Sequence, residues 1–85
     1  MALLKKDFEY LHWIEFMNYN NAKLLSVQMN VSVKGAEHTL LALQKRGLIT
    51  IEFREDIIYG SQLTEKGKNL WNNKKYASWK EELGY

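Results

Sequence analysis

The chain has 85 residues, of which 46% are hydrophobic, and a formal net charge of +2. This length allows one domain with one hydrophobic core, so residues 1–85 are expected to form a single domain. The absence of cysteine excludes disulfides and thiolate metal sites. No apolar run has the length of a membrane span and no signal peptide is recognisable, so a cytoplasmic protein without a membrane partner is expected.

The first two predicted helices cover residues 4–19 and about 22–29. In the first helix one broad apolar face is shared by Leu4, Tyr10, Leu11 and Ile14, and Phe8 flanks it. In the second, Leu25 and Met29 lie one turn apart and face inward. Asn30 follows at once, and asparagine, after glycine, best tolerates the positive φ of a tight turn between helices.

The third predicted helix, about residues 33–46, carries the clearest local signals in the chain. Ser32 is a good N-cap and Gly47 a good residue just beyond the C-terminal end. The spacing of its apolar residues and their neighbours predicts one inward face: Val31, Ala36, Leu40, Leu43 and Leu48. A short capped helix held by one face presents its other face outward.

A hairpin and a last helix complete the predicted elements. Ile49, Ile51 and Phe53 alternate with polar residues as in a half-buried strand, and residues 57–62 return after a charged tip. Thr64 is the expected N-cap of a helix over about 65–83, locally weakened by Gly67 and the Asn72-Asn73 pair. The predicted fold is therefore mainly α with a small β-hairpin wing: a winged helix-turn-helix of order α-α-α-β-β-α, its helix-turn-helix at about 22–46 and its wing at about 49–62.

The charges are unevenly distributed along the chain. Residues 21–47 carry four basic side chains and one acidic side chain, a net charge of +3. Residues 48–63 carry one basic and three acidic side chains, a net charge of −2. Residues 64–85 carry five lysines and three glutamates, a net charge of +2. A basic helix-turn-helix is the electrostatic footprint expected of a nucleic-acid binder.

Three segments resemble the winged helix-turn-helix transcription regulators of the MarR and PadR type. They are Leu25-Ser26 with Met29-Asn30-Val31-Ser32, then Leu43-Gln44-Lys45-Arg46-Gly47-Leu48-Ile49, then Leu63-Thr64-Glu65-Lys66-Gly67-Lys68-Asn69-Leu70. The resemblance implies a sequence-specific transcription regulator that binds double-stranded DNA, usually as a homodimer. The chain departs from the family's recognition helix at Val33, Glu37, Leu41 and Ala42, and its wing tip is acidic.

The resemblance makes the third helix the candidate for reading the major groove, and its outward positions are Lys34, Glu37, His38 and Thr39. Phosphate contacts are expected from Lys23, Lys45 and Arg46, for which simple solubility is the alternative. Ser32 is expected to cap the helix and also to touch phosphate. Arg54 is the candidate for a minor-groove contact by the wing, with a merely solvated tip as the alternative.

Several large apolar side chains exceed what one small core needs. We expect a dimer interface between the first and last helices from Trp13, Met17, Trp71, Tyr76 and Trp79. The alternative is a last helix that folds back over the first within one chain.

No nucleophile motif or glycine-rich phosphate loop is present, and the only imidazoles, His12 and His38, lie on different predicted helices. The sequence therefore predicts no enzyme, no cofactor, no metal and no small-molecule ligand. The alternative to DNA binding is a winged-helix protein–protein interaction module, for example a phage or plasmid accessory protein.

Overall fold

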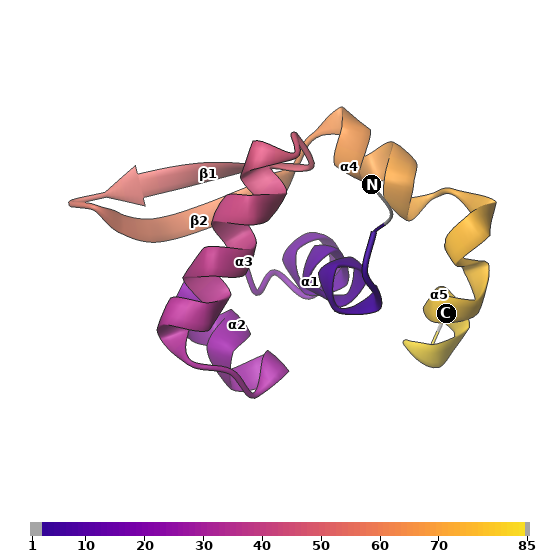
Figure 1. The fold of residues 1–85 in the computed structure, drawn as a ribbon, viewed down its shortest axis with the longest axis horizontal. Coiled ribbons are helices and arrows are strands. Elements are labelled where there is room, and N and C mark those ends of the chain that lie inside the picture. Colours follow the sequence, from indigo (N-terminus) through magenta and orange to yellow (C-terminus); the bar gives the residue numbers. More distant parts are fainter. Residues whose placement is uncertain (1–2, 85) are drawn as a thin grey trace.

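The computed structural model describes residues 3–84. Its elements, in chain order, are α1 (Lys5–Phe16), α2 (Ala22–Met29), α3 (Val33–Lys45), β1 (Ile49–Arg54), β2 (Ile57–Leu63), α4 (Glu65–Trp71), a 3₁₀ turn η1 (Lys74–Tyr76) and α5 (Ala77–Glu82). Figure 1 shows α1 between the α2–α3 pair and the α4–α5 segment, with the hairpin projecting away from the helices. The predicted coarse class, mainly helical with one hairpin, is confirmed.

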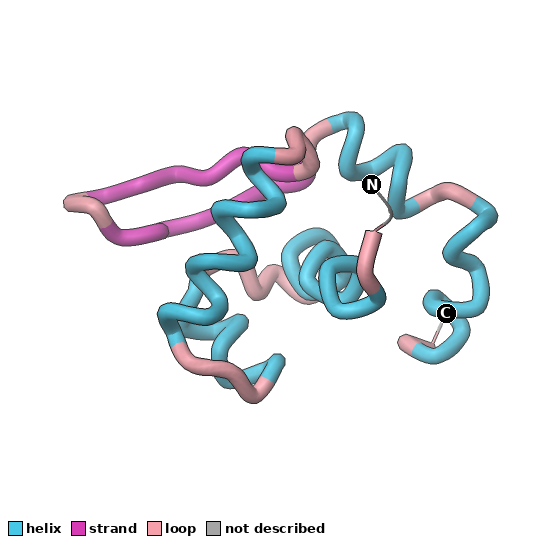
Figure 2. Tube along the Cα trace, in the orientation of Figure 1, coloured by secondary structure: helices cyan, strands magenta, loops and turns pink. Residues whose placement is uncertain are grey.

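The short loops that separate these elements (Figure 2) are built on the predicted capping residues. The Ser32 and Thr64 hydroxyls each accept a hydrogen bond from the amide three residues later, at 3.0 Å and 3.1 Å. Asn30 has φ 55° and Gly47 has φ 78°, so each helix ends in the left-handed conformation that these residue types tolerate. The C-terminal end of α2, both ends of α3 and the N-terminal end of α4 are therefore specified locally.

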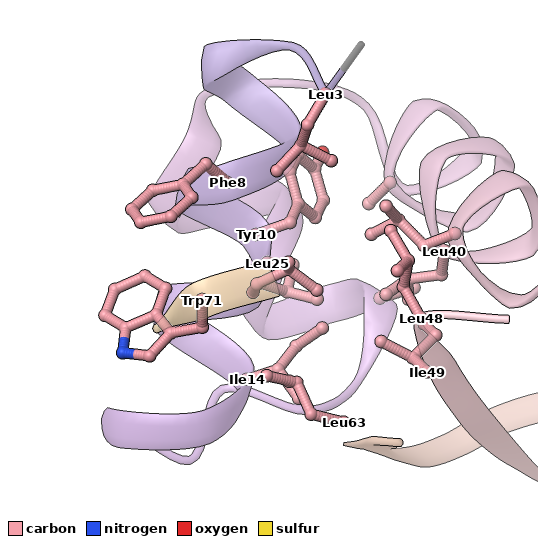
Figure 3. Close-up of a cluster of buried hydrophobic side chains, with 14 of the residues drawn as sticks. Leu3, Phe8, Tyr10, Ile14, Leu25, Leu40, Leu48, Ile49, Leu63 and Trp71 are labelled. Atoms are coloured by element: carbon pink, nitrogen blue, oxygen red, sulfur yellow. The ribbon is translucent and has the colours of Figure 1, made fainter. Parts of the chain in front are cut away.

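The core lies where α1, α2, α3 and the inner hairpin meet (Figure 3). Its fully buried large side chains are Phe8, Tyr10, Leu11, Leu25, Leu40, Leu43 and Ile49. Two residues of the predicted inward faces of the helices are exposed instead. Leu4 is the extended N-cap residue of α1 and Leu3 occupies the core in its place, while Val31 lies in the turn after Asn30 and so leaves the periodicity of α3.

The hairpin is a two-stranded antiparallel sheet whose register runs from Ile49 opposite Leu63 to Arg54 opposite Ile57, with an irregularity between Glu52 and Phe53. Its inner half packs on the core, but its outer half extends beyond the helices. The prediction that Phe53 is buried is therefore wrong, since this side chain reaches solvent.

The prediction of one continuous helix over 65–83 is also wrong. The helix α4 ends at Trp71, and the Asn73 side chain accepts a hydrogen bond from the amide of Lys75 at 2.9 Å, which starts the η1 turn. The chain then reverses direction, and the rings of Trp71, Tyr76 and Trp79 lie 4.4, 5.4 and 5.5 Å from the ring of Phe8. The break at the asparagine pair therefore lets the C-terminal segment cover α1.

One histidine belongs to this aromatic cluster. His12 is buried, with its ring centre 4.6 Å from that of Trp13 and 5.8 Å from that of Trp71. Burial disfavours the imidazolium and lowers the pKa of His12 below its ordinary value of 6.5.

The lowered pKa predicts that acid destabilises the protein. As the pH falls below 6.5, His12 is protonated in the unfolded chain but stays neutral in the folded chain. The free energy of unfolding therefore falls with pH until the pH reaches the lower pKa of the folded state. The limiting slope for one such group is about 1.4 kcal/mol per pH unit. Urea unfolding at pH 7.5 and 5.5 measures the loss, with His38→Asn as the variant that should keep it. An NMR titration in which the His12 imidazole protonates at or above its ordinary value would contradict the prediction.

Candidate nucleic-acid interface

The third helix has one buried and one open face. Ala36, Leu40 and Leu43 are buried in the core. Along the opposite side the exposed residues follow the spacing of a single helical face: Lys34, His38, Leu41 and Lys45. This row is the most basic open face that α3 offers.

The N-terminal end of α3 is held firmly beside this row. Ser32 accepts a hydrogen bond from the amide of Gly35 at 3.0 Å and remains exposed, as does Lys34 in the first turn. The cap therefore fixes the direction of the first turn, and its lysine is presented to solvent.

Thr39 and Glu37 do not share the open face as predicted. Thr39 is half-buried; its hydroxyl donates to the carbonyl of Gly35 at 3.2 Å, and its side chain also hydrogen-bonds Tyr10. Burial raises the pKa of Tyr10 above its ordinary value, and this hydrogen bond offsets only part of the rise. Glu37 is half-buried and lines a groove beside the hairpin. The predicted reading surface is thus reduced to Lys34 and His38, with Glu37 at its margin.

The Arg46 side chain, a predicted phosphate contact, is engaged by other parts of the chain. Its guanidinium lies 3.6 Å from the carboxylate of buried Asp7 on α1, and its carbonyl accepts a hydrogen bond from Lys66 Nζ at 3.0 Å. The residue therefore ties the end of α3 to α1 and α4. Lys23 and Lys45, the other two predicted phosphate contacts, are exposed.

The hairpin tip is acidic, and its arginine is engaged. The Arg54 guanidinium lies 3.8 Å from the centre of the Tyr59 ring and 3.7 Å from the carboxylate of Glu52. Glu55 and Asp56 both have positive φ, of 51° and 65°, the conformation of a two-residue turn that usually requires asparagine and glycine. Arg54 must leave its partners before it can enter a minor groove.

A groove of about 720 Å³ separates the hairpin from the N-terminal ends of α2 and α3. One wall is the hairpin, with residues 50–52 of β1 and residues 57–62 of β2; the other includes Lys23, Val33 and Glu37. Sequence reasoning missed this groove. The available signal was the run Ile57-Ile58-Tyr59, which gives β2 an apolar side chain on both faces.

The predicted aromatic interface is largely internal. Trp71 is 4% and Tyr76 is 5% exposed, and both pack on α1 of the same chain. Trp13 and Trp79 are half-buried, and Met17 is exposed. The fold-back alternative describes Trp71 and Tyr76, so the expectation that these two side chains anchor a dimer is corrected.

Within residues 3–84, no three His, Asp or Glu side chains are grouped so that they could hold a metal ion. None of the described helices combines the length and apolarity needed to cross a membrane.

Comparisons of the chain with protein-family models, with curated proteins and with solved structures found no match.

Proposed function

We propose that the chain is a winged-helix protein that binds double-stranded DNA and regulates transcription in the cytoplasm, without catalysis. The α3 helix would lie in the major groove, with the hairpin beside the backbone. The element order, with two capped helices joined at Asn30 and followed by a hairpin, supports this assignment.

The observation that carries the proposal is the exposed row on α3. Lys34 and His38 lie in its first half, where a recognition helix contacts base edges, and Lys45 lies at its far end, where a phosphate contact is expected. Lysine donates to guanine O6 and N7, and histidine can also donate to a base edge. Lys23 on α2 adds a second backbone contact.

The hairpin contributes less than α3 in this proposal. Arg54 is held by Tyr59 and Glu52, and Glu55 and Asp56 would repel phosphate. Affinity is therefore expected to depend on Lys34 more than on Arg54.

We expect Lys34→Ala to weaken DNA binding by about 1–3 kcal/mol, the range for one specific base contact. Fluorescence anisotropy with random-sequence and guanine-rich duplexes, at low and at moderate salt, measures the affinity. Lys6→Ala is the matched control, because Lys6 is an exposed lysine on α1 outside the α2–α3 unit. Its affinity should stay close to that of the unsubstituted chain.

A chain that binds neither duplex at low salt would favour the second candidate, a winged helix that binds protein. The acidic hairpin tip and the exposed apolar side chains of Leu41, Ile57 and Tyr59 favour that candidate. Equal weakening by Lys34→Ala and Lys6→Ala would show that α3 is not the reading helix.

One copy of the chain supplies one reading helix. A regulator that recognises a two-fold symmetric operator needs two copies, placed about one helical turn of DNA apart. We therefore include a homodimer in the proposal, although Trp71 and Tyr76 are buried within the single chain.

A further inference from the structure

We propose that Leu41 determines part of the DNA sequence that this chain recognises, because its side chain contacts the C5-methyl group of a thymine in the major groove. This inference rests on the proposed function, since it takes α3 as the reading helix. It goes beyond that function because it names a base for the one apolar member of the exposed row on α3.

The core fixes the direction of Leu41. Leu40 and Leu43 on the same helix are 0% and 1% exposed, and Leu40 lies among the core side chains in Figure 3. These two leucines hold the rotation of α3 about its axis, and the Ser32 cap holds its first turn. Leu41, which is 43% exposed, therefore projects from the open side of the helix.

The neighbours of Leu41 on this side are polar or basic. His38 precedes it by three residues and Lys45 follows it by four, so both adjoin it on the helix surface. The exposed row of Lys34, His38, Leu41 and Lys45 holds no acidic residue. An apolar side chain between basic residues suits a groove that has phosphates along its edges and bases on its floor.

The chemistry of leucine limits the base that Leu41 can face. Its side chain has no hydrogen-bond donor or acceptor, and in the major groove thymine alone carries a methyl group. Over guanine O6 or cytosine N4–H₂, leucine would displace water without replacing its hydrogen bond, which is unfavourable. Over thymine, the leucine and the methyl group bury apolar surface against each other. Leu41 therefore favours a thymine at its position.

The geometry of α3 places this thymine relative to the guanine that Lys34 is proposed to contact. The distance between Lys34 and Leu41 along the helix is about 10 Å, at about 1.5 Å per residue. Successive base pairs are about 3.4 Å apart. The thymine is thus expected about two to three base steps from the guanine, with His38 facing the pairs between them.

Replacement of thymine by deoxyuridine tests the contact, since it removes the C5-methyl group and keeps the pairing with adenine. The probe is a duplex that the full, unsubstituted chain selects from random sequences, in which each thymine is replaced in turn. At one thymine in each half-site the replacement should weaken binding about fourfold, because the burial of one methyl group is lost. Fluorescence anisotropy measures the affinity for each duplex.

Variants of Leu41 show whether this residue reads the methyl group. Leu41→Ala should bind the thymine duplex about fivefold more weakly and should no longer distinguish thymine from uracil at that position. Leu41→Met keeps an apolar side chain and should keep the preference. Val27→Ala is the matched control, because it shortens an aliphatic side chain that is 79% exposed on α2, outside the row; the preference should persist. If Leu41→Ala fails to fold, the deoxyuridine series on the unsubstituted chain still decides the question.

Failure of this inference and failure of the proposed function give different results. If a duplex binds and its affinity depends on Lys34, but no deoxyuridine weakens it, the inference is wrong and the proposed function stands. The same holds if Leu41→Ala keeps the preference for thymine. If no duplex binds at low salt, both are wrong.

Discussion

Gly67→Ala is expected to destabilise the protein by about 3–5 kcal/mol, a large part of the stability of a small domain. A Cβ built on Gly67 would overlap the backbone carbonyl oxygen of Leu48. The overlap is with main chain, so no side-chain rotation relieves it.

The surroundings of Gly67 cannot shift easily. The Thr64 hydroxyl donates to the carbonyl of Gly47 at 2.6 Å and accepts from the amide of Gly67 at 3.1 Å. The amide of Thr64 also donates to the carbonyl of Leu48 at 3.0 Å. These bonds fix the start of α4 against the turn after α3, so the added methyl group must separate two helices that share the core.

Urea unfolding followed by circular dichroism measures this effect. Gly60→Ala is the control, because Gly60 is also buried but a Cβ there would make only ordinary contacts, the nearest at 3.9 Å to Asn20. The explanation fails if Gly67→Ala unfolds at the same urea concentration as the unsubstituted chain.

Trp71→Ala should have a comparable effect, a loss of about 3–5 kcal/mol. The indole is buried, stacks on Phe8 at 4.4 Å and lies 5.0 Å from Phe16. Lys80 Nζ lies 5.0 Å from the centre of its ring. Removing the indole opens a cavity between α1 and α4 and also releases α5 from its contact with the ring.

Trp79→Ala is the matched comparison for this prediction. Trp79 is half-buried and contacts Phe8 edge-on at 5.5 Å, so its loss should cost clearly less. Urea unfolding of both variants gives the difference. If Trp79→Ala lowers the free energy of unfolding more than Trp71→Ala does, Trp79 on α5 and not Trp71 is the main stabilising residue of the aromatic cluster.

The elements that could be predicted from the sequence are those with local chemical boundaries. Ser32, Thr64, Asn30 and Gly47 each act on backbone within a few residues, so their effect is readable in the chain. The C-terminal segment was different. Tyr76, Trp79 and Leu83 have helical spacing, but the Asn72-Asn73 break and the attraction of Phe8 decide the path of the chain.

The candidate site divides in the same way. Periodicity alone places Lys34 and His38 opposite the core. Periodicity could not predict the contacts that engage Arg46 and Thr39, because their partners, Asp7 and Tyr10, lie on α1, far away in sequence. The groove escaped prediction for the same reason, since its walls come from α2, α3 and the hairpin.

The contact between Lys5 and Glu82 brings the start of α1 against the end of α5. Figure 1 places the start of α1 and the end of α5 on the side of the molecule away from the hairpin. An affinity tag or a surface anchor attached beyond the start of α1 or the end of α5 is therefore expected to leave α3 and the hairpin unobstructed.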